Sequence, residues 1–216
     1  MCRLLRDIQN WIIEDPFDFE DEDQSFLEAN PLHKPGDWGK ERYKPIRDKI
    51  RNHYFDQQNG TCAYCRLPIN DGTDMVPIEH IVDKSRRPEF AFLPENLVVS
   101  CYRCNTSKST KNTLYDEGVT DYPTNGSGFI IIHGHFDNYF DNIEFIDDSI
   151  YHARTTKGEK TIEYCKLDEE RKQRQREEVT KYMDDPLIQK VLQLRKTHTA
   201  KDKQKLIEEI EKLQEN

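Results

Sequence analysis

Two C-x-x-C motifs constrain this chain more than any other feature: C-A-Y-C at Cys62 and Cys65, and C-Y-R-C at Cys101 and Cys104. Each motif forms a knuckle that turns both sulfurs toward one point, and two knuckles complete the tetrahedral shell that Zn²⁺ prefers. Four thiolate ligands leave no open coordination position, so the sequence predicts a structural zinc rather than a catalytic one. Two redox pairs or two disulfides are the alternatives.

The composition explains why such a chain needs a metal. Hydrophobic residues make up 35% of the 216 residues and charged residues 34%, which is less apolar and more charged than a typical globular chain. We therefore expect an α+β fold with a modest core, stapled by the metal, and long charged surface helices. No apolar run approaches the roughly 20 residues of a membrane span, and the N-terminus lacks a signal peptide. The expected location is cytoplasmic, where cysteines stay reduced.

Charge and turn residues divide the chain into four regions: an acidic N-terminal segment (1–40), a core with both cysteine motifs (41–115), a small β region (116–166) and a charged helical region (167–216). The acidic run Glu14–Asp23 repels itself, and the prolines and glycines of 31–39 break any helix. Apolar residues from Leu4 to Ile12 have helical spacing. This first region is either a solvated lead-in or a docking strip for a basic partner.

A clearer helix is predicted from Glu41 to about Gln58. One face carries the apolar and aromatic side chains Tyr43, Ile46, Ile50 and Tyr54, and the rest is basic, with Arg42, Lys44, Arg47, Lys49 and Arg51. The cations form either a solvated outer face or a surface that contacts phosphate.

The region after the second motif predicts short strands and then helices. Phe129–Ile132 and Ile143–Ile146 are expected to be strands, and 150–154 is expected to pair with 160–164 around the turn at Lys157 and Gly158. From Leu167 onward the pattern is helical, with a second helix starting at Pro186 and a third over 200–213. Narrow apolar stripes on the last two suit a helical pair, a homodimer seam or a partner helix.

Chemistry-bearing residues lie between the two cysteine motifs. I-E-H-I-V, with Glu79 and His80, predicts one strand, and N-L-V-V-S predicts its partner. The second knuckle then opens a helix with Asn105 and Lys108 on one side. The metal would clamp this hairpin to the helix and bring His80 near Asn105. Glu79 points to the opposite face from His80 unless the strand bulges or twists.

These motifs, E-H, then E-N-L, then C-x-x-C-N-x-x-K, resemble the HNH endonuclease family, whose core is the zinc-stapled ββα-metal fold. The resemblance covers roughly residues 59–113, a quarter of the chain. Asn105 stands where the family has either Asn or His. The flanking segments resemble the HNH effectors of retron and Septu-type bacterial antiviral systems. The implied architecture adds an N-terminal helical lead-in, a C-terminal β-hairpin and charged helices.

The resemblance implies a role for each matching residue. His80 would be the general base, and Asn96 would orient its ring. Glu79 and Asn105 would hold one Mg²⁺ or Mn²⁺ through oxygen atoms. The expected phosphate contacts are Lys108, Arg103, Lys84, Arg86 and Arg87. Asp83 is a candidate additional ligand, and His133 and His135 form a candidate second metal site.

The implied function is a metal-dependent endonuclease that hydrolyses DNA, acting as an effector in antiviral defence. The implied partners are DNA and a protein such as an ATPase of the same system. The alternative is a non-catalytic zinc-ribbon module that binds nucleic acid or serves as an interaction subunit. The net charge of −9 argues against avid non-specific DNA binding by the whole surface, so a local basic face or the partner would bring the DNA.

Overall fold

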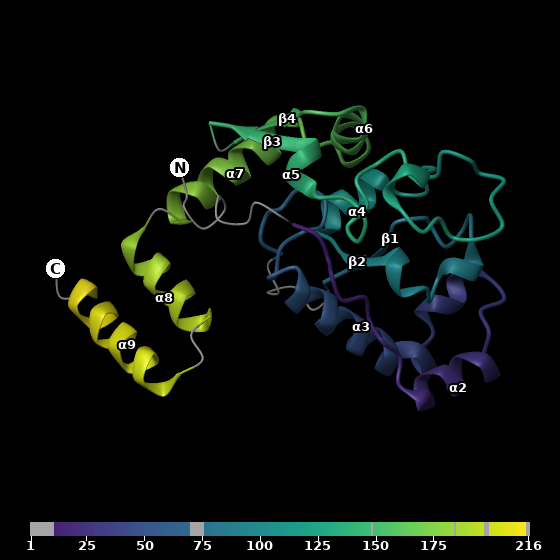
Figure 1. Ribbon diagram of the computed structural model, residues 1–216, viewed down its shortest axis with the longest axis horizontal. Helices are drawn as coiled ribbons and strands as arrows, with labels where there is room; N and C mark the ends of the chain where they lie inside the picture. The colour runs from purple at the N-terminus through teal and green to yellow at the C-terminus, as the bar shows by residue number, and fades with distance from the viewer. Residues whose placement is uncertain (1–10, 70–75, 148, 184, 197–198, 215–216) are drawn as a thin grey trace. The chain divides into compact units, whose positions relative to one another are not determined.

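The computed structural model describes residues 11–69, 76–147, 149–183, 185–196 and 199–214. The described residues fall into two compact units, the larger formed by segments 11–144 and 151–169 and the smaller by segments 145–150 and 170–214. The described residues form helices and two small two-stranded sheets (Figure 1), which confirms the predicted α+β class. The helical spacing between Leu4 and Ile12 lies almost wholly outside the described residues.

The lead-in to the core is more ordered than its charge suggested. It contains helix α2 (Asp21–Ala29) and two 3₁₀ turns, Pro35–Gly39 and Glu41–Tyr43. Three acidic residues occupy the first turn of α2, where the helix dipole favours negative charge. The helical lead-in that the resemblance implied is therefore present, and the charges that repel one another along the acidic run suit the first turn of this helix.

Helix α3 (Lys44–Gln57) follows directly and buries its predicted face. Ile46, Ile50 and Tyr54 are buried together with Tyr43, which precedes the helix. The cations of its outer face have partners within the chain: Lys49 lies 2.7 Å from Glu20 and 2.9 Å from Asp23. The acidic lead-in therefore neutralises part of the basic helix beside it.

The hairpin at the centre of the chain forms as predicted. Strand β1 (Ile78–His80) pairs antiparallel with β2 (Leu97–Val99), with His80 opposite Leu97. Between them the chain makes two 3₁₀ turns, Pro88–Phe90 and Pro94–Asn96. Helix α4 (Tyr102–Lys108) starts at the second knuckle and completes a ββα unit, while α3 packs on the hairpin.

Gln58 joins α3 to the hairpin. Its buried amide donates to the carbonyl of Val99 and accepts from the Val99 N–H, both at 2.7 Å. Gly60, with a φ of 65°, then turns the chain into the first knuckle, a backbone conformation that favours glycine.

The region after α4 contains a mixture of confirmed and wrong predictions. Ile143–Ile146 is a strand, β3, which pairs with β4 (Ile150–Ala153). Phe129–Ile132 is largely buried as expected but is not a strand, since it forms only one isolated bridge, from Phe129 to Leu114. A 3₁₀ turn (Gly126–Gly128) and a short helix α5 (Tyr139–Asn142) complete this region.

The predicted pairing of 150–154 with 160–164 is wrong, because residues Thr156–Cys165 form helix α6. Thr155 caps this helix by accepting a hydrogen bond from the Gly158 N–H at 3.1 Å. Gly158 is therefore not a turn residue. It lets the first turn of α6 approach the backbone of Asn142, whose carbonyl oxygen would lie 2.0 Å from an added Cβ.

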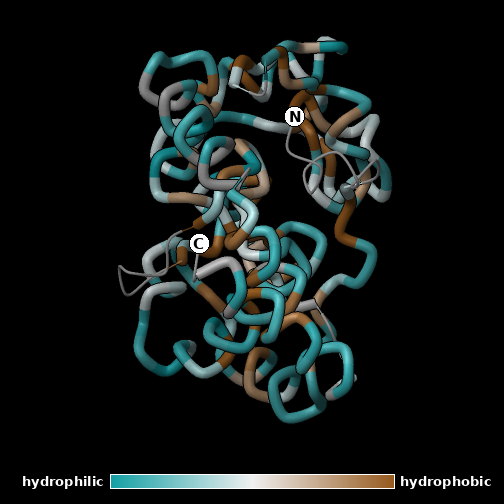
Figure 2. Tube along the Cα trace, turned by 90° about the vertical axis from the view of Figure 1, so that its left-hand side faces the viewer, coloured by the Kyte–Doolittle hydropathy of each residue, from teal (hydrophilic) through white to brown (hydrophobic). Residues whose placement is uncertain are grey.

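The smaller unit carries the three predicted C-terminal helices, α7 (Glu170–Met183), α8 (Pro186–Lys196) and α9 (Ala200–Gln214). Helices α8 and α9 lie side by side (Figure 1), with Leu206 buried and an ion pair between Lys190 and Glu209. Figure 2 shows that hydrophilic residues predominate along the described trace. Within those residues, each helix is too short or too polar to cross a lipid bilayer.

The contact at Gly158 generates a stability prediction. We expect Gly158→Ala to lower the free energy of unfolding by about 2 kcal/mol, because the backbone must shift to admit the methyl group. Gly36→Ala is the matched control, since nothing lies within 4 Å of an added Cβ there, and it should change stability by less than about 0.5 kcal/mol. Urea unfolding measures both. Equal stability of the two variants would contradict the close packing of α6.

Candidate functional site

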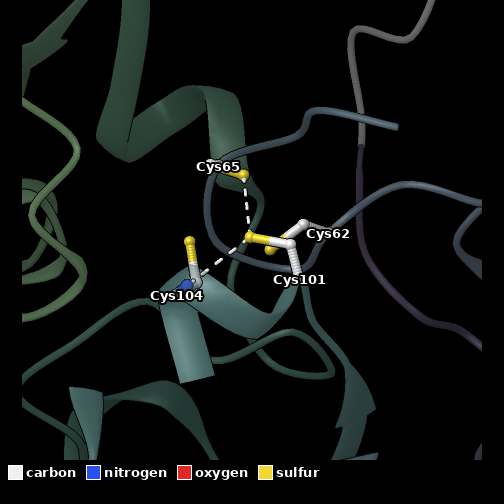
Figure 3. Close-up of side chains that lie close together, drawn as sticks. All are labelled: Cys62, Cys65, Cys101 and Cys104. Carbon is white, nitrogen blue, oxygen red and sulfur yellow. Dashed lines mark hydrogen bonds between the residues drawn. The ribbon is translucent and has the colours of Figure 1, made fainter. Parts of the chain in front are cut away.

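The four cysteines of the two motifs converge on one point. Their sulfur atoms all lie within 4.8 Å of one another (Figure 3), and the Sγ atoms of Cys65 and Cys101 are 3.8 Å apart. A tetrahedral zinc with Zn–S bonds near 2.3 Å requires sulfurs about 3.8 Å apart. The structure pairs none of the four cysteines in a disulfide. The cluster has the donor set and spacing to hold zinc.

The protonation of these sulfurs also fits a bound cation. Burial raises the pKa of the Cys62 thiol, and hydrogen bonding with Cys101 raises that of Cys65. Hydrogen bonding with Cys104 lowers the pKa of Cys101. Without a cation, the cluster thus favours one thiolate among protonated neighbours. A divalent ion would compensate the buried negative charge and deprotonate the remaining thiols.

Side chains from the later region support the first knuckle, which motif spacing did not predict. The Tyr139 hydroxyl donates to the carbonyl of Tyr64 at 2.8 Å, and the Tyr151 hydroxyl donates to the carbonyl of Cys65 at 2.7 Å. These contacts join residues more than 70 positions apart in sequence, 75 and 86. No local pattern could have found them.

His80 is held by a single defined hydrogen bond. Its Nε2 lies 3.1 Å from the carbonyl oxygen of Ala91, and because a carbonyl only accepts, Nε2 is assigned as the N–H donor. The Nδ1 atom is then the unprotonated acceptor. Burial lowers the pKa of His80 to about 3, so the imidazole is neutral at physiological pH. A neutral ring with a free lone pair can accept a proton, and the same burial makes it a weaker base than an ordinary histidine.

The Nδ1 atom of His80 remains accessible although 97% of the residue surface is covered, leaving 3% exposed. It has no hydrogen-bond partner among the described residues, and it is not one of the buried polar atoms left without a partner. The small exposed part of the ring therefore includes this nitrogen.

Asn96 is fully buried and closes the loop between the two strands. Its side-chain oxygen accepts from the Val82 N–H at 2.7 Å, and its amide donates to the carbonyls of Val82 and Phe90, each at 3.0 Å. The His80 ring itself bonds to Ala91, the residue after Phe90. Asn96 therefore hydrogen-bonds the loop that carries the Ala91 carbonyl, and it makes no hydrogen bond to the His80 ring that it was expected to orient.

Glu79 points to the other face of β1, toward α4 and the first knuckle. Its Oε1 atom lies 2.6 Å from Lys108 Nζ and 3.3 Å from the Tyr64 hydroxyl, and Lys108 also donates to the His80 carbonyl at 2.9 Å. Burial raises the pKa of Glu79, opposed by the charge of Lys108. Lys108 is only 1% exposed, so in this structure it neutralises Glu79 and does not reach the surface.

The two residues expected to hold a catalytic ion, Glu79 and Asn105, each offer an oxygen atom of the kind that Mg²⁺ prefers. The Oε2 atom of Glu79 has no hydrogen-bond partner among the described residues. It is not fully buried and keeps a small exposed surface. Asn105 lies half-buried on α4, and its side-chain amide makes no hydrogen bond to the described residues. Mg²⁺ accepts such a set, because it uses one or two protein oxygens and keeps water and phosphate ligands.

The remaining predicted phosphate contacts differ in availability. Arg86 bonds the carbonyl of Thr110 and pairs with Glu117, and Arg87 pairs with Glu89 and lies over the Phe90 ring. Lys84 and Arg103 form no ion pair in the part of the chain that the structure describes. Of the predicted phosphate contacts, Lys84 and Arg103 are therefore the two whose charges are not paired with a carboxylate of the described residues.

The side chains predicted as alternative metal ligands, Asp83, His133 and His135, make hydrogen bonds within the chain. Asp83 accepts hydrogen bonds from Ser85. His133 bonds the Tyr122 hydroxyl, and His135 bonds the Leu97 carbonyl, both at 2.9 Å through Nε2. Among the described residues, the four cysteines form the one group of three or more His, Cys, Asp or Glu side chains placed to share an ion.

Comparison with known proteins agrees with this geometry. Residues 62–111 match the family model of the HNH endonuclease. The Septu protein PtuB of Bacillus thuringiensis is 27% identical over 79 residues, a match that covers 35% of this chain and 31% of that protein. This chain therefore spans less than a third of that relative's length. The resemblance to HNH endonucleases is confirmed for the segment that contains both knuckles, the hairpin and α4.

The cysteine cluster generates a prediction about metal content. We expect the purified chain to bind one zinc, and Cys101→Ser to lose both the ion and the folded core, since metal binding contributes to folding free energy. Cys165→Ala is the control, because Cys165 is buried and hydrogen-bonds Cys104 but is not one of the four converging sulfurs; it should retain one zinc. Elemental analysis with circular dichroism tests this. A Cys101→Ser protein with normal melting and full zinc would contradict it.

The buried pair of Glu79 and Lys108 generates a second prediction. Lys108→Met should cost about 3–5 kcal/mol of stability, because it leaves a buried carboxylate without its cation. Adding Glu79→Gln to that variant should recover much of the loss, since the uncompensated charge is gone. Denaturant unfolding of the two single variants and the double variant measures the coupling. Additive losses would show that the two side chains do not interact.

Proposed function

We propose that this chain is a metal-dependent HNH endonuclease that hydrolyses DNA phosphodiester bonds with His80 as general base. The observation that carries the proposal is the bond from His80 Nε2 to the Ala91 carbonyl, which leaves Nδ1 unprotonated and accessible. The family match over residues 62–111 supports it independently.

In the proposed reaction, His80 Nδ1 accepts a proton from the water that attacks the phosphorus, and the 3′-oxygen leaves. The Ala91 carbonyl keeps the ring in the required tautomer, because it holds the proton on Nε2. Glu79 and Asn105 would hold Mg²⁺ or Mn²⁺, which would stabilise negative charge on the phosphate and the leaving oxygen. Because Glu79 lies on the opposite face of β1 from the His80 ring, the proposal requires β1 to twist when the substrate binds, so that the ion and the ring reach the same phosphate. Lys108 fixes the Glu79 carboxylate through Oε1, which leaves Oε2 for the ion.

DNA would approach through a limited basic surface. Lys84 and Arg103 are the cations proposed to contact phosphate, since those of α3 are partly engaged by Glu20 and Asp23. The chain's net charge of −9 opposes tight non-specific binding. We therefore include a protein partner that delivers DNA, such as an ATPase, and a role as an effector in antiviral defence. The similarity to the Septu protein PtuB supports this part of the proposal.

The competing function is a zinc-ribbon module that binds nucleic acid or another protein without catalysis. In that case His80 would be a packed core residue and its substitution would change stability alone. The family match over residues 62–111 favours catalysis.

Plasmid cleavage with Mg²⁺ or Mn²⁺ distinguishes the two functions. We expect His80→Ala to cut at least about 10²-fold more slowly than the unaltered chain, because a positioned general base contributes that much. His152→Ala is the control, since its side chain is 55% exposed on β4, and it should cut normally. Equal cutting by His80→Ala and the unaltered chain would remove His80 as the base. No cutting by the unaltered chain with either ion or with its partner would favour the non-catalytic module.

A further inference from the structure

The His80 ring contacts an aromatic side chain from outside the segment that matches the HNH family. Trp38, in the 3₁₀ turn Pro35–Gly39, packs against it with ring centroids 4.5 Å apart and an interplanar angle of 78°. Trp38 is 9% exposed and belongs to the same compact unit as His80. The contact joins the lead-in, which precedes α3 in the chain, to the imidazole, which follows it.

The backbone around Trp38 is tightly held. The Asp37 carboxylate accepts from the N–H groups of His33 and Lys34 at 3.1 and 3.3 Å and pairs with Lys40 at 2.8 Å. Arg47, from α3, donates to the carbonyls of Trp38 and Lys40. A turn with this many polar contacts fixes the indole in one place.

The indole also contacts the loop that binds His80. The Trp38 ring lies 4.7 Å from that of Phe92, which itself lies 5.6 Å from Tyr43. Phe92 directly follows Ala91, whose carbonyl accepts the hydrogen bond from His80. Trp38 therefore touches both the imidazole and the residue adjacent to its hydrogen-bond partner.

We propose that Trp38 is a positioning residue for His80: the indole and the Ala91 carbonyl together hold the imidazole in one rotamer and one tautomer, with Nδ1 toward the substrate. This inference rests on the proposed nuclease function and assigns part of the active site to the N-terminal lead-in. The carbonyl restrains one edge of the ring, and the indole restrains its remaining freedom to rotate.

The accessibility of Nδ1 distinguishes positioning from inhibition. An inhibitory cover would bury the nitrogen that must take the proton, whereas this atom is not among the buried polar atoms without a partner. Trp38 packs against the ring without removing all of the exposed surface of that nitrogen. Its removal should therefore slow the reaction rather than release it.

The test compares two buried tryptophans. Trp38→Leu should lower kcat by about 10²-fold, the loss typical of a misplaced catalytic group, with little change in KM. Trp38→Phe should restore most of kcat, because an aromatic ring again contacts His80. Trp11→Leu is the matched control: Trp11 is 3% exposed and packs edge-on to Tyr139 at 6.2 Å. Trp11 also lies 3.5 Å from the Arg66 guanidinium, beside the first knuckle, so Trp11→Leu should lower stability, and its effect on kcat should be much smaller than that of Trp38→Leu. Trp38→Leu with an unaltered kcat, or with a loss no larger than that of Trp11→Leu, would overturn the proposal.

A second measurement does not depend on activity. In the unaltered chain labelled with ¹⁵N-histidine, we expect the His80 ring to show a single Nε2–H tautomer and proton resonances shifted by the indole ring. In Trp38→Leu both features should disappear, whereas Trp11→Leu should keep them. If the chain cuts DNA and His80→Ala does not, yet these resonances are the same in Trp38→Leu, the nuclease stands and the positioning role fails. If no variant cuts, the proposed function fails, and the resonances alone decide whether Trp38 holds the ring.

Discussion

The convergence of four sulfurs is the constraint on which the rest of the structure depends. Cys62 and Cys65 precede β1, whereas Cys101 and Cys104 stand at the start of α4, so one ion bound between them fixes the hairpin against the helix. A chain with 35% hydrophobic residues has little apolar surface with which to do this otherwise. The hydroxyls of Tyr139 and Tyr151 add polar contacts to the same knuckle, which ties the later region to the core.

A three-residue strand then separates two kinds of chemistry. Alternation along β1 sends Glu79 toward Lys108 and His80 toward Ala91. On one face, an ion pair leaves a single carboxylate oxygen available. On the other, a backbone carbonyl leaves a single ring nitrogen available. Each side chain is held by a contact to one of its two polar atoms. Under the proposed function, the other atom would be the metal ligand in Glu79 and the proton acceptor in His80.

Local pattern predicted the elements that are regular and self-contained. The buried face of α3 and the β-branched run Leu97–Val99 follow from spacing alone. The prediction of a strand within Thr156–Cys165 is wrong for two reasons. The Thr155 cap is a local helix signal that outweighs the strand pattern, and the approach of Gly158 to Asn142 forms only in the tertiary structure. The same reason hides the contact of Trp38 with His80. The Ala91 carbonyl is invisible to sequence reasoning, since every residue has one.

Anomalous X-ray diffraction at the zinc absorption edge tests the account most directly. From crystals of the purified chain, with no metal added, we predict one strong peak at about 2.3 Å from each of the four cysteine sulfurs, with His80 Nε2 still facing the Ala91 carbonyl. The peak position reports the ion itself and does not depend on activity or on a partner. Sulfurs with no peak between them, or joined as disulfides, would contradict the claim that a thiolate-bound zinc builds this site.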